Sequence, residues 1–289
     1  MWIAESVLFW MAKRLYRTQV AHSAEMKQAL SDADQYNGYR QSQIDHVLAV
    51  AGRYGLDICE KVVLDLGCND GTMTVGYAER GAREVVGVDI DDRAIQRAKD
   101  RCNRKGVSFA VGTTTTLPIL DRSVDIILCY DVFEHVSQPA ATLQECHRVL
   151  RQGGKMLIGT WGWYHPYAPH LWATMPVPWA HVVFSERTLL RTCRRVYNSP
   201  WYVPNMHDFD ECGNRIEHKY EEDEIPVDYL NKLLIRDFER VFMASPFRCK
   251  VFSQPFGAKA ARWTKVLLRV PWVKELVTSY IWVVLEKDA

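Results

Sequence analysis

The fold of this chain is decided by residues 62–71, VVLDLGCNDG, and by residues 85–91, VVGVDID. Each stretch contains a short apolar run that ends in a carboxylate, and the first opens into a glycine-containing turn before a helix-compatible segment. Unbroken apolar runs are typical of strands buried in a parallel sheet. Because ligands of open α/β sheets bind beyond the carboxyl ends of such strands, Asp65 and Asp89 are predicted to lie at a binding edge.

The spacing of the turn indicates which ligand it fits. A dinucleotide-binding turn carries three glycines so that a pyrophosphate can approach the backbone, whereas this turn has only Gly67 and Gly71. Asp65 and Asp70 flank it, and their negative charges would repel phosphate but suit a cationic or hydroxyl-bearing ligand. S-adenosylmethionine has an ammonium, a sulfonium and ribose hydroxyls without phosphate, so it is the expected cofactor.

In these features the sequence resembles the class I S-adenosylmethionine-dependent methyltransferases. The resemblance implies an α/β fold with a seven-stranded, mostly parallel Rossmann-like sheet, to which this chain adds N-terminal helices and a large insert after the fifth strand. It also implies that the first motif holds the methionine part of the cofactor, that Asp89 binds the ribose hydroxyls and that Ile90 packs on the adenine. The residues expected to bind the cofactor are Asp65, Gly67, Cys68, Asn69, Gly71, Asp89, Ile90, Thr113, Thr114, Asp131 and Arg40.

Two positions depart from the family's pattern. Asn69 stands where glycine is commonest, but asparagine also adopts the left-handed backbone conformation at low cost. A run of one glycine and four threonines, residues 112–116, stands where the family usually carries an acidic residue that contacts the adenine. Threonine hydroxyls can accept that hydrogen bond instead, so Thr113 and Thr114 are assigned to the adenine.

Apolar runs and helical spacing outline the remaining elements. Further strands are expected at residues 107–111, 124–129, 153–160 and 247–252, with an antiparallel seventh at 277–285. Helices are expected at residues 24–33, 41–54 and 235–244, with the polar stretch 31–40 as a break between the first two. The resulting segments are an N-terminal helical part (1–56), a cofactor-binding core (57–160), a substrate-side insert or lid (161–230) and the completion of the core sheet (231–289).

An aromatic and proline-rich stretch follows the fifth strand, from Trp161 to His181. Roughly 70 residues would separate that strand from its helix, far more than the usual connection, and long loops at a ligand edge are commonly lids or pockets. Two interpretations stay open: the rings form a substrate wall, or they form the insert's own small core. A helix capped by Ser185, with an acidic first turn, is expected next.

Three histidines are candidates for a general base, namely His165, His170 and His135, because histidine titrates near neutral pH and can take the acceptor's proton. The group Asp131, Glu134 and His135 is also similar to the acidic–acidic–histidine cluster of the ubiquinone-pathway O-methyltransferases. Some of these hold a divalent cation there, so a metal stays an open alternative. Arg40 is a candidate partner for the methionine carboxylate, with a solvated arginine at a helix start as the alternative.

Composition limits the classes of molecule that this protein is expected to act on. A net charge of +1 over 289 residues lacks the basic footprint of nucleic-acid binding, which favours methylation of a small organic molecule at O, N or C and no nucleic acid. Eight cysteines without a C-x-x-C pair predict a reduced, cytoplasmic setting. The alternatives are a cofactor-binding scaffold without chemistry, or a methyltransferase that acts on a protein or RNA.

The N-terminal stretch, residues 1–14, is apolar but is not predicted to cross a membrane. Charges interrupt each apolar run before about 18 residues, and the charge order around this stretch is the reverse of that in a signal peptide. It predicts an amphipathic helix that packs on a partner or on the domain. A peripheral membrane contact through this helix and a homodimer are the other associations left open.

Overall fold

The structure is a computed structural model that describes residues 2–18, 33–210, 212–256 and 265–288. The chain divides into two compact units. The core unit consists of residues 40–162 and 231–289, and the insert unit consists of residues 1–39 and 163–230. The N-terminal boundary therefore falls between residues 39 and 40, whereas the sequence pattern places one at residue 56.

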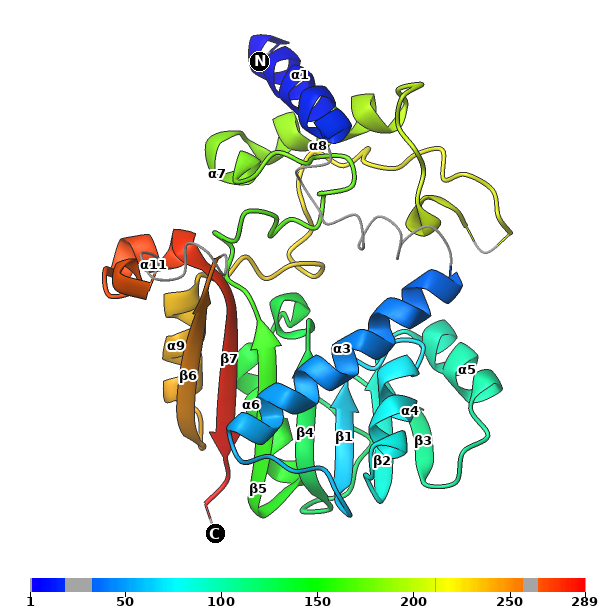
Figure 1. The fold of residues 1–289 in the computed structure, drawn as a ribbon, viewed down its shortest axis with the longest axis vertical. Coiled ribbons are helices and arrows are strands. Elements are labelled where there is room, and N and C mark those ends of the chain that lie inside the picture. The colour runs from blue at the N-terminus through cyan, green and yellow to red at the C-terminus, as the bar shows by residue number, and fades with distance from the viewer. Residues whose placement is uncertain (1, 19–32, 211, 257–264, 289) are drawn as a thin grey trace. The chain divides into compact units, whose positions relative to one another are not determined.

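The core unit is built on a seven-stranded sheet with the order β3-β2-β1-β4-β5-β7-β6 (Figure 1). Its strands are β1 (Val62–Leu66), β2 (Glu84–Asp89), β3 (Val107–Val111), β4 (Val124–Tyr130), β5 (Leu150–Thr160), β6 (Arg248–Pro255) and β7 (Thr278–Glu286). Strands β1 to β5 are parallel, and β7 is antiparallel to its neighbours β5 and β6. The predicted mostly parallel Rossmann-like sheet is confirmed.

Helices cover both faces of this sheet. Their bounds are α3 (Ala33–Arg53), α4 (Thr72–Glu79), α5 (Asp92–Arg101), η1 (Phe133–His135), α6 (Pro139–Val149), α9 (Ile235–Met243) and α11 (Pro271–Val277). Buried side chains of α3 and α4 pack with Val63 and Leu157 on one face. Those of α6 and α9 pack with Ile127 and Ile158 on the other, so the sheet is apolar on both sides.

The predicted helix break at residues 31–40 is wrong over residues 33–40, whereas residues 31 and 32 lie outside the described part of the chain. Helix α3 begins at Ala33 and continues through Gly38, where a Cβ would meet nothing within 4 Å. A glycine inside a helix costs only about 1 kcal/mol, and burial of Ile44 and Val47 farther along α3 offsets that cost. Residues 24–32 of the other predicted helix lie outside the described part of the chain.

The insert unit contains the large insert after β5 that the sequence predicts. Its helices are α1 (Trp2–Thr18), α7 (Ala180–Val183), α8 (Glu186–Tyr197) and η2 (Met206–Asp208). The Ser185 hydroxyl accepts a hydrogen bond from the Thr188 N–H, which confirms the predicted start of α8.

Helix α1 packs on α8 within the insert unit. Leu8 and Ala12 are buried in one cluster with side chains of α8, and Glu5 forms an ion pair with Arg195 at 3.1 Å. The predicted N-terminal amphipathic helix is thus confirmed, and Trp10 lies on its exposed side. No helix in the described ranges combines the length and the apolar character that crossing a bilayer requires.

Two glycines shape the turn between β1 and α4. Gly67 and Gly71 have φ angles of 79° and 78°, in the left-handed region that side chains disfavour. A Cβ at Gly67 would lie 2.3 Å from a methyl carbon of Val132, and a Cβ at Gly71 would lie 2.5 Å from the Phe109 ring. Both positions therefore favour glycine for two reasons. The backbone is in the left-handed conformation, and neighbouring side chains occupy the space that a Cβ would fill.

We expect Gly67→Ala to destabilise the protein more than Gly153→Ala. Both positions have positive φ, so both replacements strain the backbone by about 1–2 kcal/mol. Gly67→Ala also adds a steric overlap with Val132, which should cost roughly 1–3 kcal/mol more. Gly153→Ala adds no overlap, because nothing lies within 4 Å of a Cβ at that position. Urea unfolding of the two variants measures the difference. Equal losses would mean that Val132 moves aside without cost.

Candidate active site

The turn after β1 is fastened to the end of β2. The N–H groups of Gly67 and Cys68 donate to the Val88 carbonyl oxygen at 2.8 and 3.1 Å. The N–H of Asn69 donates to a carboxylate oxygen of Asp89 at 2.8 Å. Asn69 has a φ of 49°, which confirms that asparagine takes the left-handed conformation here. Hydrogen bonds therefore join the stretch 62–71 to the stretch 85–91.

Asp89 closes β2 with its carboxylate held in place from two sides. Its second oxygen accepts a hydrogen bond from the Asp91 N–H at 3.0 Å. Each carboxylate oxygen can accept more than one hydrogen bond, so both oxygens keep capacity for ligand hydroxyls. The next residue, Ile90, is 73% exposed, so its apolar side chain is accessible to a planar ligand ring.

Asp65 is buried near the carboxyl end of β1 and accepts a hydrogen bond from the Thr74 hydroxyl at 2.6 Å. Burial raises the pKa of Asp65 from 3.8 to about 6, while the Thr74 hydrogen bond and the positive charge of Arg40 lower that pKa. A buried carboxylate is costly unless a cation offsets it. The site is therefore suited to a positively charged group, and Arg40 lies within electrostatic reach of it.

Asp131 follows β4 at the same edge of the sheet. Its φ is 56°, and its N–H donates to the Gly159 carbonyl oxygen at 3.0 Å, which ties the rim to β5. The Tyr280 hydroxyl donates to an Asp131 carboxylate oxygen at 2.5 Å. Burial raises the pKa of Asp131, and the Tyr280 hydrogen bond and the charge of Arg40 oppose that rise. The sequence analysis did not identify Tyr280, because it reaches the site from the distant strand β7.

Glu134 is a second acid on this rim and is buried in η1. Thr160 donates a hydrogen bond to one of its oxygens at 2.7 Å, and the other oxygen has no hydrogen-bond partner among the described residues. Burial, together with the negative charge of Asp131, raises the pKa of Glu134. The Asn231 side chain donates to the carbonyl oxygens of Phe133 and Val136, so it fixes the backbone on both sides of this acid.

The remaining predicted cofactor residues lie beside these elements. Thr113 and Thr114 follow β3, where the Thr114 hydroxyl accepts a hydrogen bond from Thr142 at 3.0 Å. Thr113 is exposed and is paired through its hydroxyl with Thr115. Cys68 is buried, and burial raises the pKa of its thiol, so this side chain shapes the turn as a neutral group.

The structure distributes the three candidate histidines between the two units. His135 ends η1 in the core unit, directly after Glu134. His165 and His170 belong to the insert unit. His165 accepts a hydrogen bond from the Tyr167 N–H at 3.2 Å, and His170 has a φ of 58°.

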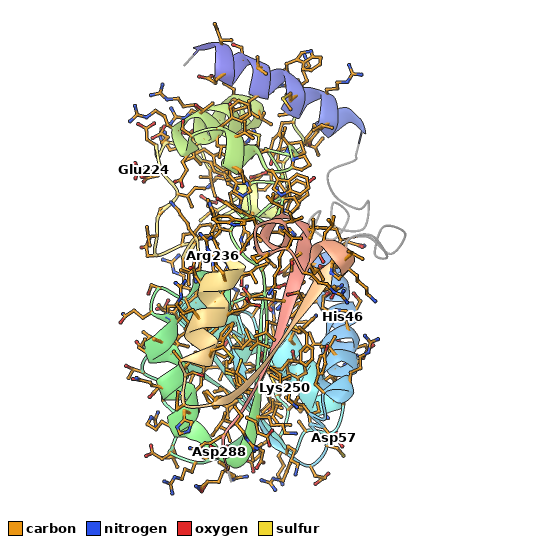
Figure 2. The ribbon with its side chains drawn as sticks, turned by 90° about the vertical axis from the view of Figure 1, so that its left-hand side faces the viewer. His46, Asp57, Glu224, Arg236, Lys250 and Asp288 are labelled. Carbon is orange, nitrogen blue, oxygen red and sulfur yellow. The ribbon has the colours of Figure 1, made fainter. Side chains whose placement is uncertain are left out.

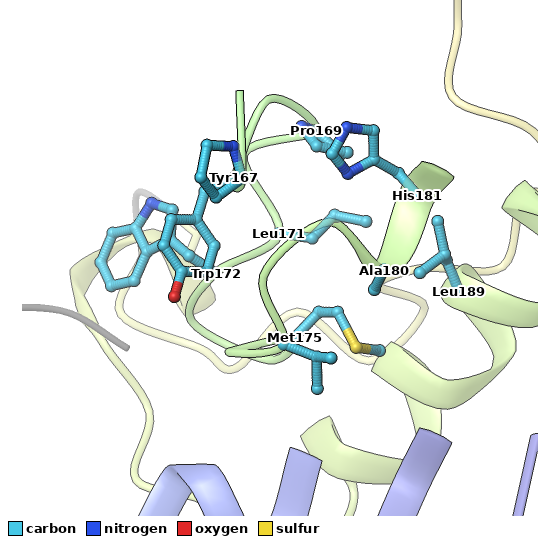
Figure 3. A pocket seen from close by; sticks show the side chains of 10 residues that line it. Tyr167, Pro169, Leu171, Trp172, Met175, Ala180, His181 and Leu189 are labelled. Carbon is cyan, nitrogen blue, oxygen red and sulfur yellow. The ribbon is translucent and has the colours of Figure 1, made fainter. Parts of the chain in front are cut away.

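The aromatic insert forms a core and also lines a pocket. Buried side chains of residues 175–202 pack together with α1. Figure 3 shows a pocket in the same unit, lined by Pro166, Tyr167, Pro169, Leu171, Trp172, Met175, Val177, Ala180, His181 and Leu189. His181 bonds to the Trp163 carbonyl oxygen at 2.7 Å, and burial lowers the pKa of this histidine. Part of the aromatic stretch is therefore structural, and part of it surrounds an apolar recess.

Known proteins share the sequence of this site. Residues 64–158 match the family described as "Methyltransferase domain". A ubiquinone biosynthesis O-methyltransferase of Nitrosomonas europaea is 32% identical over 127 residues, which are 43% of this chain and 51% of the relative. The chain thus spans about half the length of this curated relative.

Solved structures share the fold. An S-adenosylmethionine-dependent methyltransferase of Mesorhizobium loti has a TM-score of 0.51 at 15% identity, covering 84% of this chain and 100% of that one. The cyclase SpnF has the same TM-score and identity, covering 86% of this chain and 82% of that one. Proteins named for different reactions therefore share this architecture, and the reaction has to be argued from the site.

We expect Asp65→Asn to stabilise the ligand-free protein at about pH 7.5 and not at about pH 4. Because the pKa of Asp65 is about 6 when folded and 3.8 ordinarily, the folded state keeps a proton that the unfolded state releases. Stability is thus lost as the pH rises from about 4 to about 6. At about 1.36 kcal/mol per pH unit, the difference between these two pKa values is worth up to about 3 kcal/mol.

The asparagine carries no charge and can still accept the Thr74 hydrogen bond, so it avoids this loss. Denaturant unfolding at both pH values, without cofactor, measures the effect. A stabilisation that is equal at the two pH values would contradict the assigned cause.

Proposed function

We propose that this chain is a class I S-adenosylmethionine-dependent methyltransferase that methylates a small organic molecule at O, N or C. The match of residues 64–158 to a methyltransferase domain supports the reaction class. The observation that carries the proposal is the buried carboxylate of Asp65 beside a glycine turn that is itself bonded to Asp89. This edge combines an acid suited to an ammonium with an acid suited to hydroxyls. S-adenosylmethionine is the cofactor with that combination of groups.

We assign the cofactor contacts residue by residue. Asp65 and Arg40 would meet the ammonium and the carboxylate of the methionine part, because they carry opposite charges within electrostatic reach of each other. Asp89 would accept hydrogen bonds from the ribose hydroxyls, and Ile90 with Thr113 would border the adenine. Gly67 and Gly71 would shape the turn that borders the cofactor, since their positive φ angles and the close approach of Val132 and Phe109 disfavour a side chain at either position.

The bound cofactor supplies an electrophilic methyl group on a sulfonium. The residues of this chain would have to align the acceptor atom with that methyl group and provide a base for the acceptor's proton. We propose that His135, His165 or His170 is this base. Burial and the negative charge of Asp131 raise the pKa of Glu134, which favours the protonated form of this carboxyl group.

The acceptor is proposed to be small and partly apolar. Net charge near neutrality offers no general attraction for nucleic acid, and the insert supplies an aromatic and proline-rich stretch directly after β5, in a long connection of the kind that often carries binding residues. We therefore assign acceptor recognition to the insert, residues 161–230, and cofactor recognition to the core. The free state of all eight cysteines fits the proposed cytoplasmic setting.

We expect Asp89→Ala to weaken S-adenosylmethionine binding by at least about 100-fold. The replacement removes two hydrogen bonds to a charged acceptor, each worth about 1.5–3 kcal/mol, and also releases the Asn69 N–H. Titration calorimetry measures the affinity, and thermal unfolding verifies that the variant is folded. Asp91→Ala is the matched control, since Asp91 caps α5 from the same loop. Unchanged affinity in a folded Asp89→Ala variant would remove Asp89 from the site.

Replacing the catalytic histidine with alanine should lower turnover by about 10²- to 10⁴-fold. Cofactor affinity should stay within about twofold, because no histidine is assigned to the cofactor. The measurement is a pH profile of turnover for the three alanine variants, with calorimetry on each. If all three keep the parent rate and the same acid limb, the base is another group and alignment of the reactants supplies most of the rate.

A cofactor-binding scaffold without chemistry is the second candidate function, and a protein or RNA target is the third. SpnF shares the fold and is named as a cyclase, so the fold alone does not select among them. Transfer of a tritiated methyl group into separate small-molecule, protein and RNA fractions distinguishes them. Label in the small-molecule fraction, lost with Asp89→Ala, supports the proposal, whereas cofactor binding without label in any fraction supports a scaffold.

A further inference from the structure

The connection between β6 and β7 is far longer than an antiparallel pair requires. The strands pair from Arg248 to Pro255 and from Thr278 to Glu286, so 22 residues join them. Hairpin loops usually have about 2–5 residues. The segment from 265 to 277, which includes α11, is described by the structure and carries features that neither the sheet nor the cofactor site needs.

This segment is anchored to the core unit. Glu275 is buried, and its carboxylate accepts hydrogen bonds from the N–H groups of Ile235 and Arg236 at 2.8 and 3.0 Å. It thereby caps the first turn of α9, where N–H groups lack partners within the helix. Lys274 forms an ion pair with Glu239 of α9. The chain around α11 is thus held against α9 by buried and charged contacts.

Its outward side is apolar. The exposed fractions are 60% for Val266, 39% for Leu267, 46% for Val270, 72% for Trp272 and 39% for Leu276. Five large apolar side chains exposed within eleven residues form a contiguous stretch of sequence that the protein's own core does not cover. Exposed apolar clusters of this kind mark surfaces that bind something.

Cations accompany these apolar side chains. Lys265, directly before Val266, and Arg269, directly before Val270, are exposed. The Arg236 guanidinium of α9 lies over the Trp272 ring at 5.1 Å (Figure 2 labels Arg236). The acids nearby are engaged, because Glu239 is paired with Lys274 and Glu275 caps α9. The surface therefore combines an exposed tryptophan and aliphatic side chains with an excess of positive charge.

The segment lies at the edge of the sheet that carries the cofactor site. Thr160, at the carboxyl end of β5, pairs with Ile281 near the start of β7. Helix α11 ends at Val277, directly before β7, so it sits at the carboxyl edge of the parallel strands (Figure 1). A surface bound by this segment would therefore face the side of the core at which substrates enter.

We infer that residues 265–277 form a membrane-binding surface that seats the core unit on an anionic lipid bilayer. Tryptophan prefers the interface between headgroups and hydrocarbon, and interleaved lysine and arginine are attracted to anionic headgroups. The core of a protein interface is instead depleted of charge. A twofold contact between two copies would bring this positively charged surface against the same surface of the other copy, and that repulsion disfavours a dimer through this surface.

The inference is independent of the proposed methyl transfer, because lipid binding is measured without cofactor or acceptor. The test is sedimentation of the full chain with vesicles of phosphatidylcholine alone and of phosphatidylcholine with phosphatidylglycerol. We expect binding to the mixed vesicles that weakens with salt, because screening reduces the attraction between headgroups and cations.

Two variants test the surface directly. Trp272→Glu should weaken binding by on the order of tenfold or more, since it places a charge where an apolar ring enters the interface. Lys265→Glu with Arg269→Glu should weaken binding by at least about 25-fold, taking about fivefold for each cation near an anionic surface. Trp272→Phe should retain binding. Thermal unfolding and cofactor titration verify that the variants stay folded.

Matched controls come from the same unit and from α1. Leu120→Glu changes an equally exposed apolar residue, and Lys99→Glu with Lys105→Glu reverses two exposed cations elsewhere on the core unit. Trp10→Glu changes the exposed tryptophan of α1. The inference is overturned if the parent chain binds neither vesicle, or if the core-unit controls lose binding as strongly as the test variants. It is also overturned if Trp10→Glu loses binding while Trp272→Glu keeps it, or if Trp272→Glu abolishes a dimer instead.

Discussion

The burial of one carboxylate at the end of β1 organises this site. Asp65 loses its hydration in the sheet and, among the described residues, recovers one strong side-chain hydrogen bond, that of Thr74. Its ionised form is therefore maintained at a cost in folding free energy. A ligand ammonium would lower that cost. Binding of a cationic ligand would therefore recover free energy that the ligand-free protein loses by keeping Asp65 ionised and buried. The surrounding turn has to leave room for this ligand.

The order of the strands brings the other acids to the same edge. The chain runs outward from β1 to β3, then returns to the middle of the sheet at β4, and crevices form where the direction reverses. Asp89 ends β2 and Asp131 follows β4, so both belong to the rim of that crevice. Three acids separated by more than twenty residues from one to the next thus lie at one edge of the sheet because the strands are parallel.

Local features of this site could be predicted from the sequence, and distant ones could not. The run 62–66 predicts its strand, since such a mainly apolar run is typical of a strand buried in a parallel sheet, and every residue of β1 is buried. The left-handed turn at Asn69 follows from the residue type. The hydrogen bond of Tyr280 to Asp131 joins residues 149 positions apart, and no local pattern reports it. The uninterrupted helix through Gly38 was missed because tertiary contacts of α3 outweigh the local preference for a turn.

The two neighbouring acids of the rim favour ionisation to different degrees because their partners differ. Asp131 accepts a hydrogen bond from Tyr280 and feels the positive charge of Arg40, and both favour its ionised form. Among the described residues, Glu134 has Thr160 as its side-chain donor, and the negative charge of Asp131 opposes its ionisation. The pKa of Glu134 is therefore raised by this neighbour as well as by burial, so an ionised Asp131 favours the protonated form of Glu134. The negative charge of Asp131 would be opposite in sign to a sulfonium.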